Sequence, residues 1–138
     1  GVITQDEFYK LDNKNFEESI KAAIDAHKNW IGTLKSMIDK QETVPLQTNE
    51  KKCGFGHFYY SVKPKNPQIT ERWNDIESKH TQLHKYGSKV IEALNSGELN
   101  KAKEEYLEAE TISEELVNEF EKLLSVTEEL TSKEISVF

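Results

Sequence analysis

The chain has 138 residues, of which 36% are hydrophobic and 31% are charged, and its net charge is −7. This length suffices for one domain with a buried core, and the modest apolar content is typical of helices that each bury one stripe. Because an acidic protein is repelled by a phosphate backbone, we expect no nucleic-acid partner. No apolar run approaches the ~20 residues of a membrane span, so we expect no direct membrane insertion.

The chain contains a single cysteine, which excludes a disulfide within it. A lone thiol in a reducing compartment is more often a ligand or a reactive group than part of a cross-link. We therefore expect a cytoplasmic protein.

The first long helix is predicted from a change in periodicity. Residues 1–12 show no clear period and are expected to form a lead-in segment. From Asn13 onward the apolar residues recur at spacings of three and four, which predicts a helix over about 13–41, with Asp12 or Asn13 as its N-cap. Residues 42–52 are polar and contain a proline, which is typical of a loop.

The middle of the chain is predicted to hold a short element and a second long one. Residues 53–62, CGFGHFYYSV, are rich in aromatic side chains and fit a short helix or a turn. Residues 63–68 contain two prolines and are expected to form a second loop. Helical periodicity then returns over about 70–95.

The last part of the chain is predicted to be one more long helix. Residues 96–98 (Ser-Gly-Glu) indicate a helix stop and restart, and the helical pattern then continues over 99–131. Residues 132–138 are expected to form a C-terminal tail. The fold class is therefore all-α: an antiparallel four-helix bundle over 13–131, with three long helices and a short helix carrying Cys53.

Three of the four histidines occupy positions in the apolar stripes of predicted helices. His27 lies in the stripe of the first helix, and His80 and His84 lie in the stripe of the third. Residues four apart on a helix share a face, so His80 and His84 can reach one metal ion. A lone buried histidine is usually a structural residue, but three imidazoles without partners cost several kcal/mol to bury. A shared metal removes that cost.

Cys53 is the expected fourth ligand, because it directly follows a flexible loop and can swing over the bundle. The alternative role for it is a small buried hydrophobe. Three imidazole nitrogens and one thiolate form a tetrahedral set suited to Zn²⁺. The sequence therefore predicts a zinc site made of His27, Cys53, His80 and His84, with His57 as a rival ligand.

Three motifs occur in order along the chain: His27-Lys-Asn-Trp30, then Cys53-Gly-Phe55-Gly56-His57-Phe58, then His80-Thr-Gln-Leu-His84. They resemble the chemoreceptor zinc-binding domains of bacterial signalling proteins, which have His-x-x-Trp, Cys-x-Phe-Gly-x-Trp and His-x-x-x-His. Phe58 stands where that family usually has Trp. His57 falls on a variable position, which argues against it as a ligand.

The resemblance implies a four-helix fold, a zinc site of three histidines and one cysteine, and frequent homodimers. It also implies attachment to the output domain of a chemoreceptor or a diguanylate cyclase. The sequence suggests a homodimer in a second way, because the apolar stripe of the last helix extends beyond what the first helix can cover. The residues that carry this expectation are Val2, Ile3, Phe8, Tyr9, Leu123, Leu124 and Leu130.

The function expected from these observations is a zinc-binding sensory or regulatory domain in signal transduction, such as chemotaxis, and not an enzyme. Four protein ligands leave no open position on zinc for a reacting water. The signal could be zinc occupancy, or oxidation of the Cys53 thiolate by an oxidant such as hypochlorous acid.

Two alternatives stay open at this point. If Cys53 stayed away from the metal, three histidines and a water would resemble a hydrolytic zinc centre, with Glu77 or Asp25 as the candidate base. The second alternative is a metal-free interaction module whose contact face is the glutamate-rich last helix.

Overall fold

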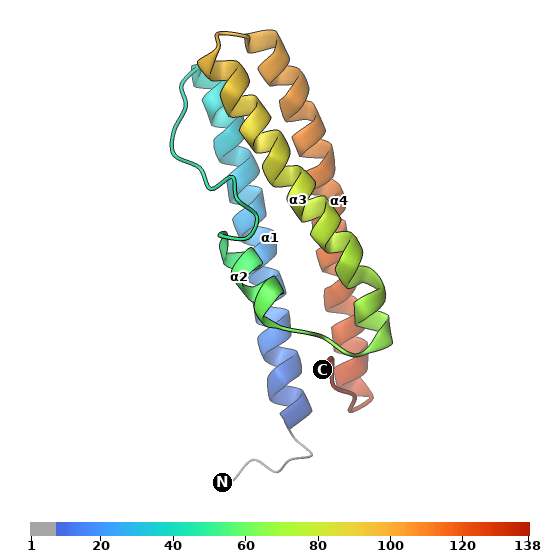
Figure 1. The fold of residues 1–138 in the computed structure, drawn as a ribbon. Helices are drawn as coiled ribbons and strands as arrows, with labels where there is room; N and C mark the ends of the chain where they lie inside the picture. Colours follow the sequence, from blue (N-terminus) through green and yellow to red (C-terminus); the bar gives the residue numbers. More distant parts are fainter. Residues whose placement is uncertain (1–7) are drawn as a thin grey trace.

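The computed structural model describes residues 8–138, and within that range it consists of α-helices and connecting segments without a β-strand (Figure 1). The helices are α1 (Phe8–Lys40), α2 (Gly54–Ser61), α3 (Pro67–Asn95) and α4 (Leu99–Ser132). The predicted all-α bundle of three long helices and a short one is confirmed. None of the described helices is long and apolar enough to cross a membrane.

The long helices α1 and α3 run in the same direction, and α4 runs antiparallel to both (Figure 1). This arrangement arises because the segment between α1 and α3, including α2, brings the chain back along the bundle. α4 packs extensively against both α1 and α3, whereas α1 and α3 meet only locally. The short helix α2 packs beside α1, about halfway along the bundle (Figure 1).

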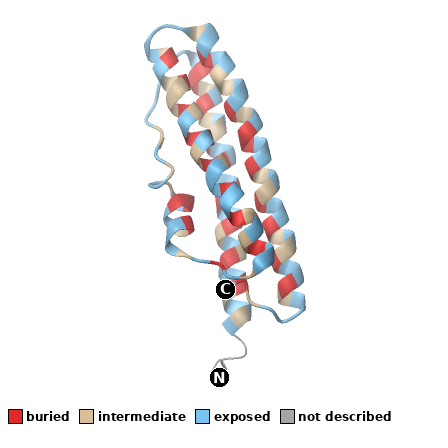
Figure 2. Ribbon diagram, turned by 45° about the vertical axis from the view of Figure 1, so that its right-hand side comes forward, coloured by how far each residue is buried: buried red, intermediate tan, exposed pale blue. Residues whose placement is uncertain are grey.

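Each long helix buries one stripe of side chains and exposes the rest, as its periodicity predicts (Figure 2). The largest fully buried side chains are Phe16, Phe120, Ile20, Leu34, Met37, Ile69, Ile76, Leu83, Leu116, Leu123, His80 and His84. Two histidines therefore lie as deep in the core as its leucines.

The helix α1 begins at Phe8 and not near Asn13, so the prediction of Asp12 or Asn13 as its N-cap is wrong. Asn13 is fully buried inside the helix, with 0% of its surface exposed. Its side-chain amide forms hydrogen bonds with residues near the C-terminus and does not cap its own helix. Residues 1–7 of the predicted lead-in segment lie outside the described part of the chain.

The C-terminal segment after α4 packs into the structure. The main-chain N–H of Val137 donates to Asn13 Oδ1 at 2.9 Å, and Asn13 Nδ2 donates to the Ile135 carbonyl at 2.9 Å. The Val137 carbonyl accepts from the main-chain N–H groups of Lys65 and Asn66, at 3.1 and 3.2 Å. This short segment thus joins the start of α1, the end of α4 and the linker between α2 and α3.

The helix α3 begins at Pro67, three residues before the predicted start. The sequence predicts a loop at this proline, but at the first helical position its missing N–H costs nothing and its fixed φ suits a helix. Asn66 caps the helix by accepting from the Gln68 N–H at 2.9 Å. The predicted stop after this helix is confirmed, since Gly97 has φ 73° and α4 starts at Leu99.

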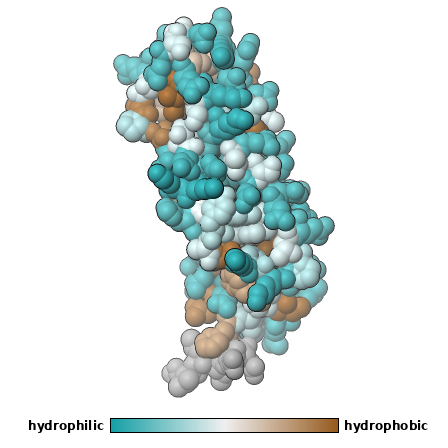
Figure 3. Space-filling view, in the orientation of Figure 1, coloured by the Kyte–Doolittle hydropathy of each residue, from teal (hydrophilic) through white to brown (hydrophobic). Residues whose placement is uncertain are grey.

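The apolar stripe of α4 does not carry the argument for a homodimer that the sequence suggested. Leu123 and Leu130 are buried within the chain itself, and Leu124 is partly buried against the core. Figure 3 shows that the visible face is mostly hydrophilic, with apolar atoms only in small, separate areas. The dimer therefore remains a prediction.

Candidate metal centre

The four predicted ligands come together in the middle of the bundle. His27 lies on α1, and Cys53 is the residue that caps the start of α2. His80 and His84 lie on successive turns of α3. One ligand atom from each side chain lies within 4.8 Å of the others. The three imidazoles are 3%, 2% and 1% exposed, in chain order, and Cys53 is half-buried.

Two distances within this group lie close to the edge length of a tetrahedral zinc site. The Cys53 sulfur lies 3.2 Å from His80 Nε2, and His84 Nε2 lies 3.1 Å from the same nitrogen. Zinc bonds of about 2.0 Å to nitrogen and 2.3 Å to sulfur place neighbouring ligand atoms about 3.3–3.6 Å apart. The remaining pairs of ligand atoms lie within 4.8 Å of one another, a spacing that side-chain adjustment can close, so this donor set fits Zn²⁺.

Two imidazoles are oriented by main-chain carbonyl groups. His27 Nδ1 lies 2.8 Å from the Ala23 carbonyl oxygen, and His84 Nδ1 lies 3.0 Å from that of Gln47. A carbonyl can only accept a hydrogen bond, so Nδ1 carries the proton on both rings and Nε2 keeps its lone pair. That lone pair is the one a metal requires, and histidine ligands commonly donate their other ring N–H to a carbonyl in this way.

Cys53 is positioned by the start of α2. It is the N-cap residue, and its sulfur accepts from the Gly56 N–H at 3.3 Å. A Cβ atom at Gly56 would collide with the Glu50 carbonyl of the preceding loop. A glycine at this position therefore lets the loop and α2 approach closely enough to bring the sulfur over the histidines.

Aromatic side chains of α2 close one side of the cluster. The Phe55 ring lies 5.0 Å from the His80 ring and 6.0 Å from that of His27, both edge to face. Phe55 is 5% exposed and also contacts Phe120 of α4, with ring centroids 4.9 Å apart. These rings keep water away from the cluster and raise the electrostatic cost of any charge placed there.

Burial sets the protonation states of the four side chains. It lowers the pKa of His80 to about 2 and that of His84 to about 4, with the neighbouring imidazoles as a further cause. Burial also lowers the pKa of His27 and raises the pKa of the Cys53 thiol. The imidazoles are therefore neutral at pH 7, which is the form that binds metal, and the thiol must release a proton on binding.

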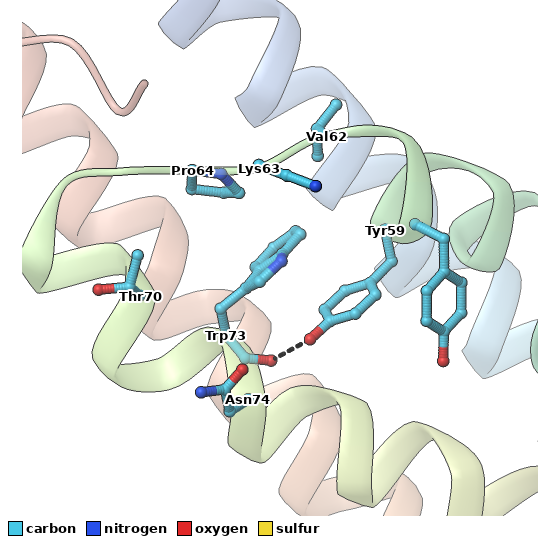
Figure 4. Close-up of a pocket in the computed structure, with 8 residues that line it drawn as sticks. Tyr59, Val62, Lys63, Pro64, Thr70, Trp73 and Asn74 are labelled. Carbon is cyan, nitrogen blue, oxygen red and sulfur yellow. Dashed lines mark hydrogen bonds between the residues drawn. The ribbon is translucent and has the colours of Figure 1, made fainter.

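A surface pocket of about 380 Å³ lies between the α2–α3 linker and α3, apart from the metal cluster (Figure 4). On its floor the Tyr59 and Trp73 rings stack with centroids 4.5 Å apart. The Tyr59 hydroxyl donates to the Trp73 carbonyl at 2.9 Å. These contacts hold the end of α2 on α3, and so help to fix the helix that presents Cys53.

The residues considered as alternatives lie outside the cluster. His57, the rival ligand, is exposed on α2. Glu77 and Asp25, the candidate bases of a hydrolytic centre, are also exposed. The supporting carbonyl groups of Ala23 and Gln47 were not predicted, because a main-chain oxygen leaves no signal in the sequence.

The comparison with protein families agrees with this geometry. Residues 27–91 match the family model described as the chemoreceptor zinc-binding domain. The match covers slightly less than half of the chain. The match begins at His27 and includes the other three cluster residues, so the resemblance predicted from the sequence is confirmed. No curated protein and no solved structure gives a significant match to the chain.

Proposed function

We propose that this chain is a zinc-binding sensory domain of a bacterial signal-transduction protein, with one Zn²⁺ held by His27, Cys53, His80 and His84. The observation that carries the proposal is the convergence of three buried imidazoles and one sulfur within 4.8 Å. Neutral imidazoles without a common partner would be costly to bury together, and a zinc ion bound by all four side chains repays that cost.

The ligands come from three separate elements, and this determines what binding can do. Zn²⁺ in a site closed by four protein ligands acts as a structural cross-link and offers no position for a reacting water. His27 belongs to α1, the histidine pair to α3, and Cys53 to the start of α2. Release of Cys53 alone would loosen the start of α2, while the Tyr59–Trp73 contacts keep its end on α3 and the three histidines keep their places.

The chemistry of Cys53 supports oxidant sensing as one form of the signal. Burial raises the pKa of the thiol, so in the metal-free protein the sulfur stays protonated and reacts poorly with oxidants. A bound Zn²⁺ would keep it as the thiolate, which takes an oxygen atom from hypochlorous acid with release of chloride, or from hydrogen peroxide with release of water. Zinc occupancy itself is the second form of the signal. The four ligands join α1, the start of α2 and α3, so the presence or absence of zinc decides whether these elements are cross-linked.

The proposal also covers the location, oligomeric state and output of the domain. By analogy with the family that it matches, the domain acts in the cytoplasm as a homodimer and controls the output domain of a chemoreceptor or a diguanylate cyclase. We infer no catalytic residue, because the two candidate bases, Glu77 and Asp25, are exposed and lie outside the metal cluster. A hydrolytic three-histidine centre would require Cys53 to point elsewhere, whereas its sulfur lies 3.2 Å from His80.

Cobalt substitution tests the proposal directly. Protein loaded with Co²⁺ should show the absorption of tetrahedral cobalt and a thiolate-to-cobalt charge-transfer band. The Cys53→Ser variant should lose that band, and the His57→Ala variant should keep it. A cobalt spectrum without the thiolate band in the wild-type protein would instead support an open three-histidine site.

A further inference from the structure

One main-chain oxygen joins three parts of the structure next to the metal cluster. The Gln47 carbonyl accepts from Trp30 Nε1 at 2.9 Å and lies 3.0 Å from His84 Nδ1. Trp30 belongs to α1, His84 to α3, and Gln47 to the irregular segment between α1 and α2. The same oxygen therefore receives two donors, one from a metal-ligand candidate and one from an indole.

The Trp30 ring is closely packed on more than one side. It is 9% exposed, and its centroid lies 5.0 Å from that of the His84 imidazole. Gly87, one turn after His84 on α3, lies directly against the six-membered ring, and a Cβ atom there would collide with it. The ring is thus clamped between α3 and the loop, with its N–H aimed at the Gln47 carbonyl.

The two supported histidines differ in what supports them. His27 bonds the Ala23 carbonyl of its own helix, an oxygen that the helix already holds in place. His84 depends on an oxygen in a segment without regular structure, which must be held by something else. The Trp30 N–H of α1 is the second donor to this oxygen, and it holds the oxygen at the cluster independently of His84.

We propose that Trp30 is a positioning residue for the zinc site: it anchors the Gln47 carbonyl, which in turn orients His84 for coordination through Nε2. This inference rests on the proposed zinc-binding function. It assigns to the indole N–H a role distinct from filling the core. Outer-shell partners of histidine ligands typically change metal affinity about 10–100-fold when they are removed.

The decisive variant is Trp30→Phe, which keeps an aromatic ring and removes the N–H donor. Zinc dissociation constants would be measured by chelator competition on folded, metal-free protein, with folding checked by circular dichroism. We expect the constant to rise at least about tenfold. The matched control is Tyr106→Phe, which also removes a hydrogen-bond donor from an aromatic side chain, the hydroxyl that donates to Glu110 on α4, and it should change the constant less than about twofold.

A second variant displaces the ring without removing the donor. Gly87→Ala forces the Trp30 ring away from α3, so it should also weaken zinc binding. Alanine is otherwise the better helix residue, so an effect through helix propensity alone would have the opposite sign. In both variants, amide hydrogen exchange over residues 42–52 should be faster than in wild type, because the loop has lost its anchor.

The outcomes separate this inference from the proposal on which it rests. If the wild-type protein binds zinc, and Trp30→Phe binds it as tightly while losing only stability, Trp30 is a packing residue and the inference is wrong. If the wild-type protein takes up no zinc, the proposed function fails, and the positioning role fails with it. Tight binding by wild type, with a selective loss in Trp30→Phe and Gly87→Ala, is the result that we expect.

Discussion

Replacement of Asn13 by alanine should destabilise the protein far more than its place near the start of a helix suggests. The Asn13 side chain is fully buried and makes hydrogen bonds to Thr131 Oγ1, the Ile135 carbonyl and the Val137 N–H, at 3.0, 2.9 and 2.9 Å. Alanine removes all three and leaves the buried Val137 N–H without a partner. Each lost or unsatisfied hydrogen bond costs roughly 1 kcal/mol or more, so we expect a loss of about 2–4 kcal/mol.

A loss of this size is a large part of the stability of one domain, which is typically about 5–15 kcal/mol. Urea unfolding of metal-free protein would measure it, and the melting temperature should fall by roughly 6–12 °C. Asn15→Ala is the matched control, because Asn15 is an exposed asparagine in the same helix. Its effect should stay within about 0.5 kcal/mol.

Hydrogen exchange adds a local readout to the Asn13 experiment. In Asn13→Ala the amides of Lys65, Asn66 and Val137 should lose protection, since the first two donate to the Val137 carbonyl. Equal stabilities for Asn13→Ala and Asn15→Ala, with these amides still protected, would refute the assignment of Asn13 as the anchor of the C-terminal segment.

Further predictions concern the metal cluster. Burial lowers the pKa of His80 to about 2 and of His84 to about 4, from 6.5, so below pH 6.5 the unfolded chain binds more protons than the folded one. The free energy of unfolding of metal-free protein should therefore be highest above pH 6.5 and fall as the pH falls toward 4; urea titrations that give one value from pH 5 to 7.5 would contradict this. Gly56→Ala should raise the zinc dissociation constant by displacing the start of α2, and unchanged affinity in a chelator titration would argue against that close approach. His80→Ala should lose most of the melting-temperature increase that zinc produces, whereas His57→Ala should keep it; the reverse order would reassign the ligands.

The helices could be predicted from the sequence because periodicity reports burial. The stripes on α1, α3 and α4 each repeat with the helical period, and the structure buries them as expected. The helix α1 starts earlier than predicted. The apolar residues of its first turns, such as Phe8 and Leu11, are exposed and do not continue the buried stripe from which the helix is predicted. The start of α3 differs from the prediction because a proline such as Pro67 fits a loop and the first turn of a helix equally well.

The grouping of the four candidate ligands was also predictable, since histidines replaced apolar residues in the stripes and Cys53 followed a loop. The contacts that support the cluster were not. The Gln47 carbonyl is a main-chain atom, and its role depends on a fold that brings Trp30 and His84 to the same place. The bonds of Asn13 reach partners 118 to 124 residues away, and no local pattern indicates pairs so distant.

The most direct test of the account is the metal content of the protein purified without added zinc. Wild-type protein should contain about one zinc per chain, and protein stripped by a chelator should take up the same amount on titration. His84→Ala should fall well below that value, and His57→Ala should match wild type. Less than about a tenth of an equivalent in carefully handled wild-type protein, with no uptake on titration, would contradict the zinc site and the function proposed from it.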